Sequence, residues 1–390
     1  MDSKRLASKG AWLKPDKPAS IAWLGLFVPG LVCYLHFLSM HLNQYAEVKG
    51  SKIERHSRQL DDIIPKEAKV EMVADGFVFT EGAQWVNDQE AGRQYLLFSD
   101  IPNNRIWKWE EGGGMLTLGK SLFLDRSGCS GDSYCGMSEP GSNGLLLTPE
   151  SGGVLMCEHG NRRVTRMEKN GTKTPLATHF NGHRLNSPND LVFSKRGDVY
   201  FTDPPYGLPL RENDPGFTVR GFGGVYRVRR EAIESAQAVE NVAADPELLE
   251  EEFVWPNGLA FAPDFSKLYL AVASPQNPAW YVYDVSEDGD LTNRRLFYDG
   301  LPMREGGRVG APDGLKLDEH GNVFAAAPGG LAVISPDGEL LGMVYTGGVF
   351  VANVVVGGDG YLYMTASESI MRVKVLTKAA PTPPPPPSAT

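Results

Sequence analysis

PNDLVFSKRGDVYFTD, residues 188–203, places a carboxamide and a carboxylate directly before an apolar strand. Val, Phe and Tyr predict short β-strands on both sides of a turn at residues 196–198. Asn189 and Asp190 stand where the first strand should enter a core, and an unpaired polar group is costly there. The question is what these two side chains bind.

The same pattern recurs six times between residues 75 and 376. In each copy a polar residue precedes apolar residues, a turn follows, and a second strand rich in Tyr, Phe or Leu comes next. The polar positions are Glu81, Asn143, Asn189, Asn257, Asp313 and Asn353. Repeats of about fifty residues, with several short strands and little helical periodicity, predict an all-β, six-bladed β-propeller over residues 65–377. Because the innermost strands line the channel of a propeller, we expect the six side chains to converge at its axis.

The residue types in this predicted ring favour a cation. Glu81 and Asp313 carry negative charge, and Asn189 and Asn257 offer neutral amide oxygens. Oxygen ligands without thiolates or clustered histidines favour Ca²⁺, with Mg²⁺ or Mn²⁺ as substitutes and Zn²⁺ as a poorer match. The alternative is that the Asn-Gly and Asp-Gly pairs only hydrogen-bond neighbouring blades.

The charge of the chain is unevenly distributed. The 390 residues have a formal net charge of −10, but residues 1–60 have a net charge of +5, which leaves −15 for the remainder. An acidic body repels phosphates, so the sequence argues against a nucleic-acid partner. It is compatible with a cation site or a neutral substrate.

Residues 21–42, IAWLGLFVPGLVCYLHFLSMHL, contain no Asp, Glu, Lys or Arg. This length can cross a hydrocarbon core of about 30 Å as a helix. The basic segment of residues 1–20 favours a cytoplasmic N-terminus, so we predict a single-pass transmembrane signal anchor followed by a linker over residues 43–64. The propeller would then be lumenal or extracellular; a cleaved signal peptide is the alternative.

Three further features bear on the compartment and the chain ends. Asn170 begins an Asn-Gly-Thr sequon and is a candidate glycosylation site. Cys129 and Cys135 flank a Gly/Ser loop and could form a disulfide in an oxidising compartment, whereas in cytosol they would be loop thiols. Residues 378–390 are rich in proline and are expected to form an extended, disordered tail.

Seven stretches resemble the gluconolactonase and senescence-marker-protein (regucalcin-like) family of six-bladed propellers, and most of all its bacterial gluconolactonase branch. They are EGAQW (81–85), SDIPNNRIWKW (99–109), CEHGNRRVTR (157–166), RLNSPNDLVF (184–193), YFTDPPYGL (200–208), FVWPNGLAFAPD (253–264) and APDGLKLD (311–318). The resemblance covers about residues 70 to 374. It implies a divalent cation held by a Glu of the first repeat, two Asn and an Asp, which are Glu81, Asn189, Asn257 and Asp313 here.

Members of this family hydrolyse sugar lactones, and related propellers hydrolyse other esters or organophosphates. The chain departs from the family pattern in its N-terminal segment, its proline tail and an insert at residues 123–141, FLDRSGCSGDSYCGMSEPG. We expect this insert to cover a rim of the propeller near the substrate.

The predicted function is a metal-dependent hydrolase that opens sugar lactones. A cation would polarise the lactone carbonyl for attack by water. Asp313 and Asp190 are the candidate bases, and Asp190 has the alternative role of orienting Asn189. The substrate is expected to contact Asn143, His159, Arg162 and Tyr206.

Motifs of other hydrolase classes are missing from the sequence. No Gly-x-Ser-x-Gly elbow, His-Glu-x-x-His helix or phosphate-binding glycine loop occurs, so serine-hydrolase, zincin and nucleotide hypotheses lack support. The competing hypothesis is a non-catalytic propeller that binds calcium, or a partner, through its rim.

Overall fold

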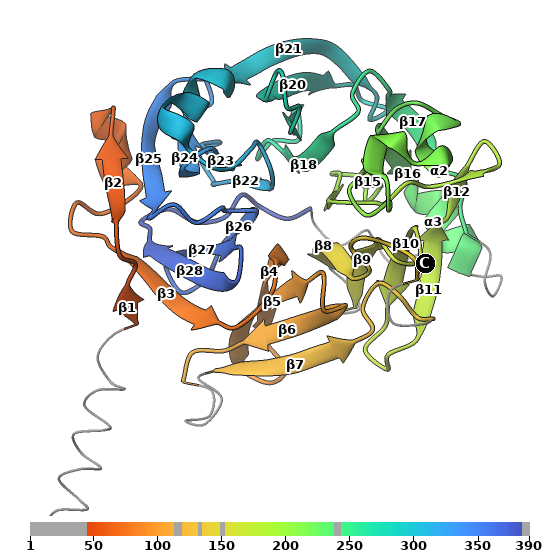
Figure 1. Cartoon of the computed structure of the whole chain (residues 1–390), viewed down its shortest axis with the longest axis horizontal. Coiled ribbons are helices and arrows are strands. Elements are labelled where there is room, and N and C mark those ends of the chain that lie inside the picture. The colour runs from red at the N-terminus through yellow and green to blue at the C-terminus, as the bar shows by residue number, and fades with distance from the viewer. Residues whose placement is uncertain (1–44, 113–118, 132–134, 149–152, 238–242, 384–390) are drawn as a thin grey trace, which may run out of the picture. The chain divides into compact units, whose positions relative to one another are not determined.

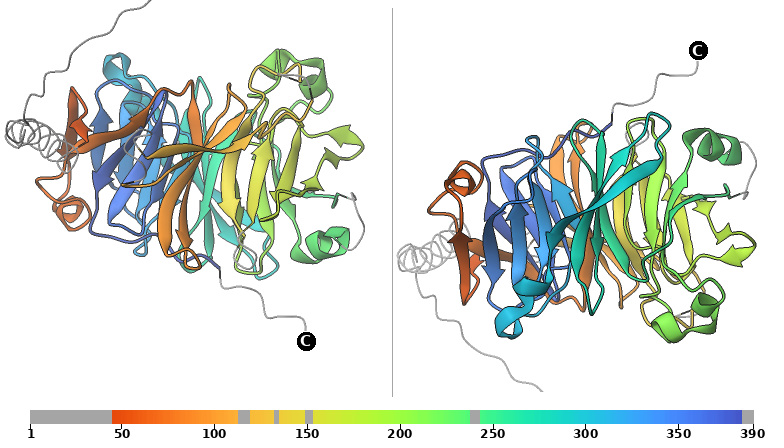
Figure 2. Two further views of the ribbon diagram at one scale, coloured as in Figure 1. Left: turned by 90° about the horizontal axis from the view of Figure 1, so that it is seen from below. Right: turned by 90° about the horizontal axis from the view of Figure 1, so that it is seen from above.

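Six antiparallel sheets of four or five strands surround a common axis in the computed structural model, which describes residues 45–112, 119–131, 135–148, 153–237 and 243–383 (Figure 1). Strands adjacent in the chain are neighbours in each sheet, apart from the strands contributed by the N-terminal segment. Figure 2 shows the sheets edge-on, arranged as blades around the axis. The predicted six-bladed propeller is confirmed.

In the first three blades, the strands follow the chain order from the axis outward. Blade 1 contains β4 (Thr80–Asp88), β5 (Arg93–Asp100), β6 (Arg105–Trp109) and β7 (Lys120–Asp125). Blade 2 contains β8 (Ser142–Leu147), β9 (Val154–Glu158), β10 (Arg163–Met167) and β11 (Lys173–Ala177). Blade 3 contains β14 (Leu191–Phe193), β15 (Val199–Asp203), β16 (Gly224–Val228) and β17 (Glu247–Glu250).

The other three blades follow the same plan. Blade 4 contains β18 (Pro256–Phe261), β19 (Lys267–Val272), β20 (Ala279–Val285) and β21 (Leu291–Asp299). Blade 5 contains β22 (Leu315–Leu317), β23 (Val323–Ala327), β24 (Gly330–Ile334), β25 (Leu340–Thr346) and β2 (Ser51–Arg55). Blade 6 contains β26 (Asn353–Val356), β27 (Tyr361–Ala366), β28 (Ser369–Lys374), β3 (Val70–Asp75) and β1 (Ala46–Glu47).

The loops carry short elements that lie outside the six blades. They are η1 (Arg58–Asp62), the ribbon of β12 (His179–Phe180) and β13 (His183–Arg184), η2 (Arg211–Asn213), α2 (Pro215–Thr218), α3 (Arg230–Gln237) and η3 (Leu301–Gly307). The longest of these helices has eight residues, in keeping with the weak helical periodicity of the sequence.

Blade 6 closes the ring by joining the two ends of the propeller. The N-terminal strand β3 pairs with the C-terminal strand β28, with Asp75 opposite Ser369 and Val70 opposite Val373. This pairing covers the edge of β28, which would otherwise be open to pairing with another chain. The core lies between blades, as where Phe324 and Val344 of blade 5 belong to one buried cluster with Met364 of blade 6.

The structure places residues 46–64, which the sequence analysis assigned to a linker, on the propeller. Strand β2 pairs with β25 along its whole length, and β1 pairs with β3 (Figure 1). Leu60 and Ile64 are fully buried against blades 5 and 6. Because these few apolar residues are separated by polar ones, their composition alone resembles that of a linker.

The two predicted ends are only partly described. Ala379 pairs with Asp318 and the Ala380 amide donates to the Leu317 carbonyl at 2.9 Å, so the predicted tail begins on blade 5. The predicted anchor, residues 21–42, and the basic segment 1–20 lie outside the described residues. Within the described ranges, no helix combines the length and apolar character needed to span a bilayer.

Neighbouring inner strands approach one another so closely that no side chain fits between their backbones. A Cβ at Gly144 would lie 2.6 Å from the Asn189 carbonyl oxygen, and one at Gly258 would lie 2.6 Å from the Asp313 carbonyl oxygen. The Gly144 amide donates to that Asn189 oxygen at 2.7 Å. Glycine therefore follows the polar residue in these repeats because the next blade occupies the space of a side chain.

We expect Gly144→Ala to lower the free energy of unfolding by about 1–3 kcal/mol, because the new methyl group overpacks the contact between blades 2 and 3. Urea unfolding measures this change. Gly131→Ala is the matched control, since its Cβ would meet only the Cys135 sulfur at 3.6 Å, and it should change stability by less than about 0.5 kcal/mol. Equal effects of the two substitutions would contradict the packing argument.

Candidate functional site

The six repeat residues all lie at the first positions of the inner strands or two residues before them, and we call them the axial ring. Each is at least nine-tenths buried. Glu81, Asn143, Asn257 and Asn353 belong to β4, β8, β18 and β26, while Asn189 and Asp313 lie two residues before the first residues of β14 and β22. The repeat therefore does what the sequence predicted, which is to bring one polar side chain from each blade to the axis.

Within the axial ring, Glu81 is held by direct hydrogen bonds. Its Oε2 accepts from the Gly82 amide at 2.7 Å and from Nδ2 of Asn353 at 2.9 Å. The other end of the Asn353 amide, Oδ1, accepts from the Val354 amide at 2.8 Å. Both ends of Asn353 are therefore occupied, and its role is to orient Glu81.

Three carboxyl groups of the ring region, those of Glu81, Asp190 and Asp313, influence one another electrostatically. Burial is the main cause that raises the pKa of Glu81 to about 7, with the charge of Asp190 acting in the same direction. Burial, followed by interaction with Glu81 and repulsion by Asp190, raises the pKa of Asp313 well above its usual range. Glu81 and Asp313 are thus electrostatically coupled, as two carboxyl groups that bind one ligand would be.

Asp190 occupies the position at which four of the six repeats have glycine. Its Oδ1 accepts from the Leu191 amide at 2.9 Å, and its Oδ2 lies 3.6 Å from Nζ of Lys316 on β22. Lys316 thus reaches Asp190 from a different blade, and the sequence analysis did not identify it. Its positive charge offsets part of the negative charge at the axis.

The chemistry of these side chains fits a divalent cation. Buried oxygens with no hydrogen-bond donor in the described ranges include Asn143 Oδ1, Asp190 Oδ2 and Asp313 Oδ1. Such oxygens are costly unless a ligand pairs with them. The donor set of carboxylates and amides matches hard cations such as Ca²⁺. Among the described residues no three His, Cys, Asp or Glu side chains form a metal cluster, so a cation here needs the amides.

Tyr206, predicted to contact substrate, lies beside the ring. It follows β15, and its hydroxyl accepts from Nδ2 of Asn257 at 3.2 Å. Its ring stacks on Trp255, with 5.2 Å between centroids. Burial, aided by the charge of Asp313, raises the pKa of Tyr206 well above its usual value, so the hydroxyl stays protonated and can donate a hydrogen bond.

His159 and Arg162 differ in their placement. His159 follows β9 directly, at the same end of blade 2 as Asn143, and is fully buried with Nδ1 3.4 Å from Oε2 of Glu139. Arg162 instead donates through Nε to the carbonyls of Leu185 and Asn186 at 2.7 and 3.1 Å. Arg162 therefore holds a loop of blade 3, and the structure does not bring it to the axial ring.

The structure describes both the predicted disulfide and the predicted glycosylation site. Cys129 and Cys135 form a disulfide within the insert. Asn170 lies exposed in the turn between β10 and β11, where its Oδ1 accepts from the Thr172 amide at 2.9 Å. An exposed sequon on a turn is sterically accessible to modification.

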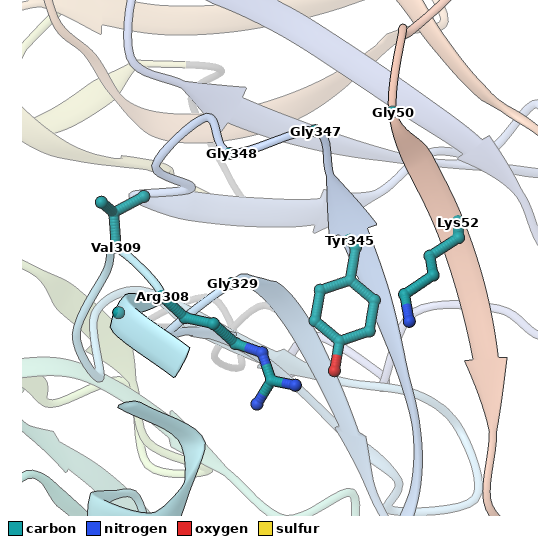
Figure 3. Close-up of a pocket in the computed structure, with 9 residues that line it drawn as sticks. Gly50, Lys52, Arg308, Val309, Gly329, Tyr345, Gly347 and Gly348 are labelled. Atoms are coloured by element: carbon teal, nitrogen blue, oxygen red, sulfur yellow. The ribbon is translucent and has the colours of Figure 1, made fainter. Parts of the chain in front are cut away.

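A separate pocket of about 370 Å³ lies over blade 5, away from the axial ring (Figure 3). Lys52 and Arg308 flank the ring of Tyr345, with Nζ and Cζ at 4.6 and 5.3 Å from its centroid. None of the residues of the axial ring lines this pocket, so it is not the site that the repeats predict.

Sequence reasoning missed Glu139, Trp255 and Lys316. Trp255 and Lys316 stand two residues before Asn257 and three after Asp313, so proximity to a ring residue was the only available signal. Their contacts with Tyr206 and Asp190 cross between blades, and no local pattern encodes such contacts.

A closed six-bladed propeller with a ring of buried carboxyl and amide side chains at its axis defines the class of this protein. The family model described as SMP-30/Gluconolactonase/LRE-like region matches residues 73–368. A gluconolactonase of Zymomonas mobilis is 35% identical over 332 residues, covering 84% of this chain and 86% of the relative. The chain belongs to the SMP-30/gluconolactonase/LRE-like family and is a gluconolactonase-like enzyme, as the sequence predicted.

Solved structures agree with this assignment. A gluconolactonase from Xanthomonas campestris has a TM-score of 0.67 and 25% identity, covering 85% of this chain and 97% of its own. A calcium-binding regucalcin from Agrobacterium tumefaciens has a TM-score of 0.57 at 13% identity, covering 80% and 96% of the two chains. At that identity the regucalcin shows the shared fold alone.

The buried Glu81 predicts a pH-dependent stability for the cation-free protein. Its pKa is about 7 in the folded state against an ordinary value of 4.5, so between these values the folded state binds more protons than the unfolded state. Stability therefore falls as the pH rises from about 4.5 to about 7. With chelator present, Tm should be lower at pH 8 than at pH 5.5, and Glu81→Gln should flatten this dependence.

The same linkage predicts how a cation changes the dependence. Because a cation binds the ionised carboxylates, added Ca²⁺ should raise Tm more at pH 8 than at pH 5.5. Differential scanning fluorimetry of the native and Glu81→Gln proteins at both pH values measures both effects. An unchanged pH slope in Glu81→Gln would show that other groups cause it.

Proposed function

We propose that the chain hydrolyses sugar lactones at the axial ring, with a divalent cation, of which Ca²⁺ fits best. The observation that carries this proposal is the convergence of Glu81 and Asp313 with the ring amides, in a chain 35% identical to a gluconolactonase. Esters or organophosphates handled by the same fold are the alternative substrates.

Glu81, Asn189, Asn257 and Asp313 would hold the cation. The amide nitrogen of Asn257 donates to Tyr206, which leaves the amide oxygen to serve as the cation ligand. When bound, a dication polarises the lactone carbonyl and stabilises the negative charge that develops on its oxygen.

The two candidate bases differ in their surroundings. Asp190 has one oxygen bonded to the Leu191 amide and the other 3.6 Å from Lys316. Asp313 has a buried oxygen, Oδ1, with no hydrogen-bond partner in the described ranges. We therefore assign proton acceptance from the attacking water to Asp313, and to Asp190 a positioning role beside Asn189 and Lys316.

Tyr206 would orient the substrate. Its oxygen accepts from Asn257, which leaves its own hydrogen free to donate to an oxygen of the lactone. The stack on Trp255 fixes the direction of this donor. Asn143, whose Oδ1 is buried and unpaired, would accept from a substrate hydroxyl.

Asp313→Asn should reduce lactone hydrolysis by about 10²- to 10⁴-fold, because the variant keeps the shape of the side chain but loses the base. Hydrolysis of D-glucono-δ-lactone, corrected for spontaneous opening, is followed with a pH indicator. Chelator should remove the activity of the native chain, and Ca²⁺ should restore it. Glu90→Gln is the control, since Glu90 is 84% exposed in the turn between β4 and β5.

These results separate the enzyme from a non-catalytic propeller. Undiminished turnover by Asp313→Asn in the presence of Ca²⁺ would refute the assigned base. Tight Ca²⁺ binding by the native chain without turnover of any lactone, ester or organophosphate would favour a calcium-binding or partner-binding propeller.

We also propose that the propeller lies in an oxidising compartment, lumenal or extracellular. The Cys129–Cys135 disulfide and the exposed Asn170 sequon support this. Protein expressed in a secretory host should lose mass on treatment with an N-glycosidase, and Asn170→Gln should show no such shift on gel electrophoresis. A reduced Cys129 in freshly isolated protein would argue for the cytosol.

A further inference from the structure

We propose that Glu139, carried by the insert of residues 123–141, is a specificity-determining residue that binds hydroxyl groups of a neutral sugar lactone. This inference rests on the proposed lactone hydrolysis and adds which lactones the site selects. Four features carry it: the anchoring of the insert, the position of Glu139, an unsatisfied histidine and the charge around the axial ring.

The insert is bound to the propeller at both ends. At its start, the Asn104 side chain brackets the backbone of Cys129, with its Oδ1 accepting from the amide at 3.0 Å and its Nδ2 donating to the carbonyl at 2.9 Å. Near its end, the Ser138 amide donates to the Gly207 carbonyl at 3.1 Å, and the Ser138 hydroxyl lies 3.1 Å from the Tyr206 carbonyl oxygen. The disulfide ties Cys129 to Cys135 between these anchors.

These anchors place Glu139 beside the residues that surround the ring. Its Oε2 lies 3.4 Å from Nδ1 of His159, and its side chain is 24% exposed. The preceding residue, Ser138, has its hydroxyl 3.1 Å from the Tyr206 carbonyl oxygen, so the backbone next to Glu139 lies against that of Tyr206. Tyr206 is itself hydrogen-bonded to Asn257 of the ring, so Ser138 and Glu139 are linked to the axial ring through Tyr206.

Apart from the 3.4 Å approach of Glu139 to Nδ1, the imidazole of His159 has no polar partner in the described ranges. His159 is fully buried, and neither ring nitrogen makes a hydrogen bond within the described ranges. Burying a polar group without a hydrogen bond lowers the stability of the fold, unless a ligand supplies the missing hydrogen bond. A carboxylate accepts, an imidazole both donates and accepts, and a phenol donates. Glu139, His159 and Tyr206 therefore match a ligand with several hydroxyl groups.

The charge around the ring selects against anions. The cation proposed for the axial ring would offset Glu81 and Asp313, and Lys316 lies beside Asp190, so the carboxylate of Glu139 adds negative charge that these groups do not balance. A phosphorylated or carboxylated lactone would meet repulsion here that a neutral one avoids. The selected class is an uncharged lactone with hydroxyl groups on its ring or side chain.

The experiment compares two lactones that differ in their hydroxyl groups. Steady-state kinetics of native protein, Glu139→Gln and the control Glu90→Gln are measured with D-glucono-δ-lactone and with unsubstituted δ-valerolactone. Loss of a hydrogen bond to a charged acceptor should lower kcat/KM for the gluconolactone by about 10- to 100-fold, mainly through KM. The value for δ-valerolactone should change by less than about twofold, which is within the range of a neutral contact.

Two further measurements do not depend on turnover of a neutral lactone. Binding of 1,5-anhydroglucitol, a neutral polyol without a carbonyl, should weaken in Glu139→Gln by isothermal titration calorimetry and stay unchanged in Glu90→Gln. We expect a 6-phosphorylated gluconolactone to be a poor substrate of native protein and to become relatively better in Glu139→Gln. Thermal unfolding confirms that both variants are folded.

The outcomes are distinct. An equal loss on both lactones, or no loss on either with unchanged polyol binding, would overturn the role of Glu139 while leaving the lactonase proposal in place. Native protein that turns over neither lactone in the presence of Ca²⁺ would overturn both proposals. A loss restricted to the hydroxylated lactone supports Glu139 as the residue that selects it.

Discussion

The close approach of neighbouring inner strands at the axis is the constraint on which the rest of the structure depends. Where Gly144 and Gly258 pass the next blade, no Cβ fits, so backbone and side-chain oxygens are forced into a small volume. The ring of polar residues follows from this geometry, because each strand begins at the axis and contributes its first side chain there. A looser ring would admit water and separate Glu81 from Asp313. The close contact between neighbouring inner strands therefore also brings the charged side chains of the axial ring together.

That concentration of charge has a cost which the structure meets in two ways. Lys316 approaches Asp190 from another blade, and the Asn353 amide donates to Glu81. Burial, together with the remaining repulsion, raises the pKa values of Glu81 and Asp313, so without a cation protons can neutralise these carboxylates. A divalent cation would replace these protons and leave the carboxylates ionised. A site that served structure alone would have little need for such a set of acids, since apolar packing of equal volume is usually as stable.

The sequence predicted the elements that repeat and missed the contacts that do not. Six copies of one pattern were sufficient for the blade count and for the placement of the axial ring, because each copy occupies the same position in its blade. Strands β1 and β2 were assigned to a linker. Apolar residues of this segment, such as Leu60, are few in the sequence, and only the structure shows that they pack against the blades. Lys316 and Trp255 act across blades, where no local periodicity records a partner. Arg162 was expected at the substrate, yet its Nε binds backbone carbonyls of a neighbouring loop.

The third repeat shows why fold and chemistry cannot be separated in this ring. Asp190 stands where four other repeats have glycine, and the space for it exists because its neighbour in blade 2 is Gly144. A Cβ at Gly144 would lie 2.9 Å from Oδ1 of Asp190 and 2.8 Å from its Cα. The same absent side chain thus lets two blades meet and lets an acid enter the axis between them. Because Asp190 is acidic, Lys316 of blade 5 can approach it as a counter-charge. The departure of the third repeat from the common pattern therefore introduces the Asp190–Lys316 ion pair.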